Sequence, residues 1–358
     1  MRNVTLKLSD GTTFNGQSFG YEKSVSGEVI FNTAMIGYPE CLTDPSHAGQ
    51  ILVLTYPLIG NYGVPPFSKD ENGIVKFLES EKIHIKALVV SDYSEAYSHW
   101  NASESLGDWL KREKIPAITG VDTRELAKTL REKGVMSGCL IFDNKDNEET
   151  SFPYDTTNWV AEVSCKEVTH YNIGGKKKVV LLDCGVKNNI IRSLLRRDVE
   201  VIRVPWNYDF TGLDFDGLLI SNGPGNPNML SEAIKNIQAF LKSETIKPCM
   251  GICLGNQLLA KAIGAEINKM GYGHHSTNQP VRRVGTNSCY ITNQNHGYVV
   301  NAKTLPSDWS EMYINMNDGS NEGIKHNNNP WFAVQFHPES CNNPVKADAL
   351  YDEFVNSL

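Results

Sequence analysis

The sequence predicts an α/β protein of two domains: a β-rich mixed domain of residues 1–145, a linker of residues 146–175, and a domain of residues 176–358 with a mainly parallel sheet flanked by helices. Three observations lead to this prediction. The first half holds short strand-like runs, the second half alternates strand-like and helix-like segments, and a polar, irregular stretch separates them. At 358 residues the chain is long enough to bury two hydrophobic cores.

The first domain begins with apolar runs of strand length, separated by glycine, proline and Asp-Pro-Ser turns. The expected strands are VTLKL (4–8), EVIFNTAM (28–35) and QILVLTYPLIG (50–60). Helical patterns follow at 71–82, 103–114 and 122–135. Asp122 suits the N-cap of the third helix, and Gly134 suits its C-terminal stop. We therefore expect one small domain of mixed structure.

The second domain shows a regular alternation of strand-like and helix-like segments. In chain order they are KVVLLDC (178–184), NNIIRSLLRR (188–197), VEVIRVPW (199–206), FDGLLISNGPG (215–225), EAIKNIQAFLKS (232–243) and KPCMGICLGNQLLAKAIG (247–264). This order predicts a parallel sheet with crossover helices. Ligands bind beyond the carboxyl ends of such strands, where the loops ISNGPG and MGICLG are expected.

The composition excludes several function classes. Hydrophobic residues make up 40% of the chain and charged residues 21%, and no apolar run reaches the length of a membrane span. The formal net charge of −7 argues against a broad nucleic-acid surface. Eight cysteines without a CxxC pair fit a reducing compartment better than a disulfide framework. We expect a cytoplasmic protein with no membrane segment and no nucleic-acid partner.

Cys253 lies in GICLGNQLL, residues 251–259, between two glycines and between an expected strand and an expected helix. A GxCxG segment in that context is the cysteine form of the nucleophile elbow, in which small neighbours allow a sharp turn. The helix that follows directs its positive end toward the sulfur and favours the thiolate. The alternative is an inert buried cysteine, which we assign to the other seven. The two glycines favour a nucleophile.

His337 is the candidate base for this thiol. It follows the apolar run WFAVQF, and Pro338 favours an extended backbone at this position. Residues two apart on an extended chain point to the same side, so Glu339 can accept a hydrogen bond from the His337 ring. Cys253, His337 and Glu339 would then be nucleophile, base and orienter. The alternatives are a solvent-exposed histidine here, or His296 of QNHGYVV as the base, which has no carboxylate at that spacing.

Two other features are weighed as sites. His274 and His275 are adjacent, but adjacent side chains on a strand diverge and no third ligand is evident, so we expect hydrogen-bonding histidines and no metal. The glycines of SNGPG, residues 221–225, can turn backbone N–H groups toward an oxyanion. An ordinary turn is the alternative. With one donor from Gly225 and one from Leu254, the groups for acyl transfer would be complete.

The motifs ISNGPG, GICLGNQ, QNHGY and FHPES, in this order and spacing, are similar to the class I glutamine amidotransferase domain over residues 176–358. The first half, through GEVIFNTAMIGYPECLTDPSHAGQILVLTYPLIGNYG and VDTRELAKTLREKGVMSG, resembles the N-terminal domain of the carbamoyl phosphate synthetase small subunit. The segment LLDCGVKNNIIRSLL also looks like that subunit. Nearly the whole chain is covered by the resemblance.

The resemblance implies a glutaminase in which Cys253, His337 and Glu339 hydrolyse glutamine through a cysteine thioester. The glutamine site that it implies consists of Ser46, Gly223, Gly225, Leu254, Gln257, Asn295, Gly297 and Tyr298. Three positions depart from the family's pattern: Asn256 stands where a histidine is usual, Gln279 stands where the strand usually continues toward a histidine, and CNNP (341–344) replaces the usual PGP. None of the three removes a catalytic group.

The resemblance also implies a division of labour with a partner. Carbamoyl phosphate synthesis needs ATP and bicarbonate, and this chain has no GxxxxGK[ST] loop. We expect no cofactor in this chain, and expect a heterodimer whose large, ATP-binding synthetase subunit uses ATP and a divalent metal for pyrimidine or arginine biosynthesis. Another cysteine hydrolase and a non-catalytic relative are the alternatives. The N-terminal domain argues against another cysteine hydrolase, and the intact Cys253, His337 and Glu339 argue against a non-catalytic relative.

Overall fold

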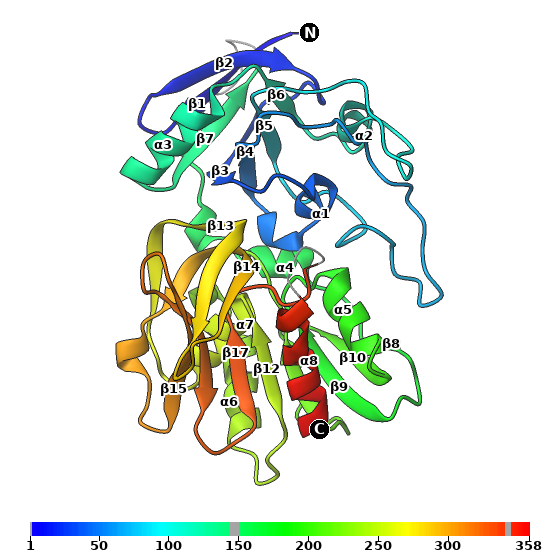
Figure 1. Ribbon diagram of the computed structural model, residues 1–358, viewed down its shortest axis with the longest axis vertical. Coiled ribbons are helices and arrows are strands. Elements are labelled where there is room, and N and C mark those ends of the chain that lie inside the picture. Colours follow the sequence, from blue (N-terminus) through cyan, green and yellow to red (C-terminus); the bar gives the residue numbers. More distant parts are fainter. Residues whose placement is uncertain (1, 143–149, 341–344) are drawn as a thin grey trace. The chain divides into compact units, whose positions relative to one another are not determined.

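The computed structural model describes residues 2–142, 150–340 and 345–358. They form two compact units, unit 1 of Met1–Asp155 and unit 2 of Thr156–Leu358 (Figure 1). Part of the predicted linker, 146–149, lies outside the described residues. From Thr156 onward the rest of the linker belongs to unit 2, because Trp159 and Val160 are buried there. The polar composition of this stretch concealed those two anchoring side chains.

Unit 1 contains a closed barrel of seven strands in the order β1-β2-β6-β5-β4-β3-β7. The strands are β1 (Asn3–Leu8), β2 (Thr13–Ser18), β3 (Val25–Asn32), β4 (Gln50–Leu54), β5 (Ala87–Val90), β6 (Ala117–Thr119) and β7 (Met136–Ile141). Pairs along β3-β4-β5-β6 are parallel and the others antiparallel. Every residue of β4 is buried, because successive side chains alternate between two hydrophobic clusters on opposite faces of the strand.

The helices of unit 1 are α1 (Tyr38–Leu42), η1 (Pro45–His47), α2 (Leu106–Arg112) and α3 (Thr123–Lys133). The predicted ends of α3 are confirmed: the Asp122 carboxylate accepts from the Glu125 N–H, and Gly134 is the C-cap with φ 91°. The helix predicted over 71–82 is wrong. Gly73 and Phe77 both have positive φ there, and the chain forms turns instead.

Unit 2 contains a ten-stranded sheet in the order β14-β13-β15-β16-β17-β12-β11-β9-β10-β8. The strands are β8 (Thr169–Tyr171), β9 (Lys177–Asp183), β10 (Val199–Pro205), β11 (Gly217–Ile220), β12 (Cys249–Ile252), β13 (Ile267–Arg283), β14 (Cys289–Val300), β15 (Trp309–Asn315), β16 (Asn321–His326) and β17 (Trp331–Val334). The run β17-β12-β11-β9-β10 is parallel, and the remaining pairs are antiparallel. The expected mainly parallel sheet is therefore mixed, because residues 267–326 form antiparallel strands without crossover helices.

The helices of unit 2 lie before, between and after its strands along the chain. They are η2 (Tyr154–Thr156, shared with unit 1), α4 (Trp159–Val163), α5 (Asn188–Leu195), η3 (Pro227–Met229), α6 (Ser231–Leu241), α7 (Leu254–Ala262), η4 (Ala302–Thr304) and α8 (Val345–Ser357). In Figure 1, α8 lies in front of the central strands and α6 behind them. Among the described residues, no helix is both long and apolar enough to cross a membrane.

Candidate active site

Cys253 lies at the sharp turn that joins β12 to α7. Its backbone has φ 55° and ψ −104°, a strained conformation for a residue with a Cβ, and its N–H donates to the Val334 carbonyl at 2.8 Å. A Cβ at Gly255 would lie 2.1 Å from the Ile220 carbonyl oxygen, and one at Gly251 would lie 2.7 Å from the Gly255 carbonyl oxygen. Both positions therefore exclude larger residues, which gives GxCxG its strand-to-helix turn.

His337 and Glu339 follow β17, the strand that pairs with β12. The Nδ1 atom of His337 lies 2.7 Å from Oε1 of Glu339, and both side chains are buried. A charged carboxylate only accepts hydrogen bonds, so Nδ1 carries the proton. The other ring nitrogen, Nε2, is then the one that exchanges a proton with a neighbour.

The charges around this pair favour its ionised form. Burial and the Lys187 ammonium both oppose protonation of His337, but Glu339 and Cys253 outweigh them and raise the pKa of His337 to about 10. Burial alone would raise the pKa of Glu339, yet Lys187 and His337 lower it to about 2. A cationic His337 therefore lies beside Cys253 and carries a proton that it can donate.

Lys187 is a component of the site that the sequence analysis did not identify. Its Nζ lies 3.0 Å from Oε1 of Glu339, with only 6% of the lysine side chain exposed. Lys187 is the N-cap of α5, and Asn189 in the same helix donates a hydrogen bond to the main-chain oxygen of Glu339. Its place after β9, at the carboxyl end of a central strand, was the available signal.

The thiol lies among residues predicted for the glutamine site. Cys253 Sγ donates to the Asn295 carbonyl at 3.6 Å, and Gln257 Nε2 donates to the Tyr298 carbonyl at 3.1 Å. A Cβ added at Gly223 would lie 2.9 Å from a methyl carbon of Leu254, so the SNGPG loop abuts the residue after Cys253.

The remaining predicted residues are distributed as follows. Gly225 has φ 85° and lies against Trp159, and a Cβ at Gly297 of β14 would meet open space. Ser46 is a buried residue of η1 in unit 1. Contacts of all these residues with glutamine stay predictions.

Two of the departures from the family's pattern lie in hydrogen-bonded positions. Asn256 Nδ2 donates to Oε1 of Gln335 at 3.1 Å, and Gln257 Nε2 donates to the same oxygen at 3.3 Å. Gln279 Nε2 donates to the Ser276 hydroxyl, and its oxygen accepts from Asn317. Both side chains are thus held by amide and hydroxyl groups. The third departure, CNNP (341–344), lies outside the described residues.

His296, the rival base, contacts a main-chain carbonyl and an amide side chain, and it hydrogen-bonds to no carboxylate among the described residues. Its Nδ1 lies 2.9 Å from the Tyr298 carbonyl oxygen, and burial, followed by the His274 charge, lowers its pKa well below the usual value. His274 contacts Gln294 and Asp318 through its two ring nitrogens. Ligand atoms of His274, His296 and Glu322 all lie within 4.8 Å of one another, and hydrogen bonds to protein groups occupy both histidines. The expectation of no metal therefore stays a prediction.

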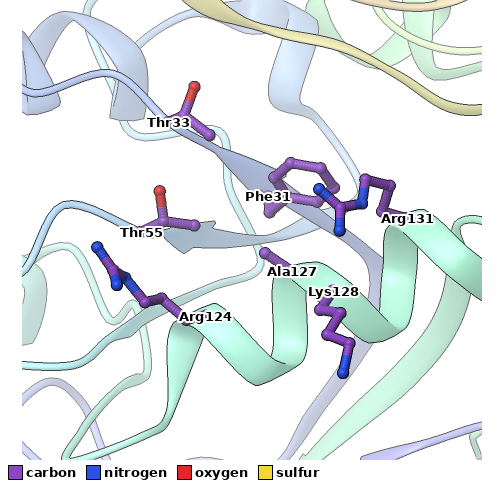
Figure 2. A pocket seen from close by; sticks show the side chains of 7 residues that line it. All are labelled: Phe31, Thr33, Thr55, Arg124, Ala127, Lys128 and Arg131. Atoms are coloured by element: carbon purple, nitrogen blue, oxygen red, sulfur yellow. The ribbon is translucent and has the colours of Figure 1, made fainter.

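A basic groove of about 300 Å³ lies beside α3 in unit 1 (Figure 2). Its lining residues are Phe31, Thr33, Thr55, Arg124, Ala127, Lys128 and Arg131. Figure 2 shows that the three cationic side chains come from one helix. The groove has cations and hydroxyls suited to an anion, but no thiol, imidazole or carboxylate. It is therefore not a site for acyl transfer.

Comparisons with known proteins match a family to each of the two units. Residues 6–140 match the family described as carbamoyl-phosphate synthase small chain, CPSase domain. Residues 180–357 match the family described as glutamine amidotransferase class-I. These two matches cover most of unit 1 and most of unit 2.

Similar curated proteins match nearly the whole chain. The multifunctional protein CAD of Squalus acanthias is 51% identical over 98% of this chain and 16% of its own length. The multifunctional protein pyr1-3 of Dictyostelium discoideum is 46% identical over 99% of this chain and 17% of its own length. The human mitochondrial carbamoyl-phosphate synthase (ammonia) is 47% identical over 99% of this chain and 23% of its own length. The chain thus spans a quarter or less of these relatives.

Proposed function

We propose that this chain, which belongs to the carbamoyl-phosphate synthase small-chain family, hydrolyses glutamine to glutamate and ammonia. The reaction would take place in its class I glutamine amidotransferase domain. The ammonia would pass to a large synthetase subunit or domain that makes carbamoyl phosphate from bicarbonate. The product would serve pyrimidine or arginine biosynthesis, in the cytoplasm.

The observation that carries the proposal is the buried ion pair of His337 and Glu339 beside the thiol at the elbow. In the proposed reaction the Cys253 thiolate attacks the side-chain amide carbon of glutamine, and the carbonyl oxygen becomes an oxyanion. The backbone N–H groups of Gly225 and Leu254 would donate hydrogen bonds that stabilise this oxyanion. His337 would protonate the leaving ammonia and then deprotonate the water that hydrolyses the thioester.

The names of the relatives leave the nitrogen donor open. One relative at 47% identity is named for ammonia, so overall similarity does not decide whether a chain of this family uses glutamine. The candidate catalytic groups of this chain favour glutamine as the nitrogen donor. A thiol at a strained elbow next to an oriented imidazole has no use in a protein that only receives free ammonia. This reasoning supports glutamine as the substrate.

The proposed partner supplies what this chain lacks. The synthetase would bind ATP and a divalent metal, and this chain would contribute nitrogen alone. The curated relatives support this pairing, because each is far longer than the segment that matches this chain. A fused domain and a separate subunit are both compatible with it.

The test compares two single-cysteine variants of the chain in complex with its synthetase. Cys253→Ala should abolish carbamoyl phosphate synthesis from glutamine and leave synthesis from added ammonia unchanged. Cys249→Ala is the matched control, since Cys249 is equally buried but belongs to β12 before the elbow, and it should retain both activities. Loss of both activities in Cys253→Ala would make the residue structural. Retained glutamine use would refute the proposal.

A further inference from the structure

Unit 1 contains a second thiol–imidazole pair, far along the chain from Cys253. The Sγ atom of Cys41, in α1, lies 3.3 Å from Nε2 of His47, in η1. The side-chain amide of Asn32 also approaches this sulfur, with Nδ2 at 3.8 Å. A thiol in contact with an imidazole and an amide donor has the surroundings that favour a thiolate.

The orientation of the His47 ring is fixed by a chain of hydrogen bonds. Gln50 Nε2 donates to a carboxylate oxygen of Glu28 at 3.0 Å, so Gln50 Oε1 is the atom that faces His47. That oxygen lies 3.0 Å from His47 Nδ1 and can only accept, so Nδ1 carries a proton. In a neutral ring, Nε2 is then the basic atom, and it is the one that faces Cys41.

The supporting groups are rigidly placed. His47, Gln50 and Glu28 are all buried, with 1%, 6% and 7% of their surfaces exposed. Glu28 and Gln50 are direct partners across the parallel pair of β3 and β4. The arrangement corresponds to that of a nucleophile with its base and orienting groups. The Cys41 thiol would be the nucleophile and the His47 imidazole its base, and Gln50 and Glu28 would orient the imidazole.

Cys41 differs from the buried cysteines of the chain in its access to small molecules. It is only partly buried and lines a small hollow with Met35 and Ile36, whose side chains are 64% and 58% exposed. Burial raises the pKa of Cys184 and of Cys249, which have no such opening. An apolar entrance suits small, uncharged reagents.

We propose that Cys41 is a second nucleophilic thiol of this chain, activated by His47, and that small, uncharged, soft electrophiles such as hydrogen peroxide modify it. His47 takes the thiol proton, and the sulfur attacks one peroxide oxygen. An S–O bond forms, the O–O bond breaks, and the leaving hydroxide takes a proton to become water. The sulfur is oxidised by two electrons to a sulfenic acid, and the peroxide is reduced by two. This inference does not rest on the proposed glutaminase activity.

The kinetic test uses the full chain with Cys253→Ala, so that the elbow thiol cannot react. Iodoacetamide is applied briefly over a range of pH, and the alkylated fraction of each cysteine peptide is measured by mass spectrometry. Cys289, which is exposed, is the internal reference. The alkylation midpoint of Cys41 should lie at least about one pH unit below that of Cys289. At acidic pH, Cys41 should be alkylated several-fold faster than Cys289. A thiolate of lower pKa is a weaker nucleophile, but this offsets only part of the gain from the larger thiolate fraction.

Two variants identify the activating group. His47→Asn should move the Cys41 midpoint up to that of Cys289, whereas His99→Asn, which removes an exposed histidine, should leave it in place. With hydrogen peroxide, a dimedone adduct should form on Cys41 and be absent in Cys41→Ser. Coincident midpoints for Cys41 and Cys289 in the parent chain would overturn the proposal, even if His47→Asn failed to fold. An unchanged midpoint in a folded His47→Asn chain would overturn it as well.

Discussion

Glu339 is buried between two cationic groups, the Lys187 ammonium and the His337 ring. Burial destabilises the charged carboxylate, but the attraction of these two cations stabilises it by more. The pKa of Glu339 therefore falls to about 2. His337 gains in turn, and its pKa rises to about 10. Glu339 therefore orients and charges His337, the proposed base, while Lys187, from the loop after β9, keeps Glu339 ionised.

The ionisation of Glu339 predicts a pH dependence of stability. The pKa of its carboxyl is lower in the folded chain than its ordinary value of 4.5, so its contribution is complete above about pH 4.5 and is lost as the pH falls toward 2. The unfolding free energy of the parent minus that of Glu339→Gln should therefore shrink between about pH 5 and about pH 2.5. Urea titrations at several pH values measure it. A difference that stays constant over this range would contradict the assigned ion pair.

Removing Lys187 should destabilise unit 2, because a buried carboxylate loses one of its two cations. Lys187→Met should lower the unfolding free energy by about 3–5 kcal/mol, the usual effect of breaking a buried ion pair. The matched control is Lys178→Met, since Lys178 forms its ion pair with Asp214 at the surface and should show no measurable change. Denaturant unfolding monitored by tryptophan fluorescence compares the two. Equal stabilities of the two variants would contradict a structural role for the Lys187–Glu339 pair.

At the scale of elements, the turn between β12 and α7 stores backbone strain at Cys253. Its φ of 55° and ψ of −104° are costly for any residue with a Cβ, typically by about 1–3 kcal/mol. Cys253→Ala keeps this strain, whereas Cys253→Gly relieves it. We predict that the unfolding free energy of Cys253→Gly is higher than that of Cys253→Ala by about 1 kcal/mol, although both lack the thiol. Denaturant titrations of the two variants measure the difference. A less stable glycine variant would show that the elbow is not strained.

The same element shows what a sequence can and cannot predict. The two glycines around Cys253 and the QFHPES segment have local signals, because each depends on residues within a few positions. For Lys187 the only local signal was its place after β9, and its contact with Glu339 spans 152 positions along the chain. The turns over 71–82 were mistaken for a helix because Ile74, Val75 and Leu78 have helical spacing, whereas the backbone has positive φ at Gly73 and Phe77.

At the scale of the whole molecule, the division into two domains follows from composition, but the boundary and the sheet depend on distant contacts. Trp159 and Val160 anchor the predicted linker in unit 2, and residues 267–326 add antiparallel strands to a parallel core. The closed barrel of unit 1 depends on pairing between β1 and β7, which are the first and last strands of this unit in sequence. The alternation of strands and helices along the sequence predicts only the parallel central part of the sheet in unit 2.

Covalent labelling tests whether Cys253 is the nucleophile that attacks glutamine. The full chain is treated with a glutamine analogue that carries a diazoketone in place of the amide, and the labelled peptide is identified by mass spectrometry. Glutaminase activity should fall in proportion to labelling of Cys253, and excess glutamine should protect both. Inactivation with Cys253 unlabelled, or labelling of Cys253 with no loss of activity, would contradict the account.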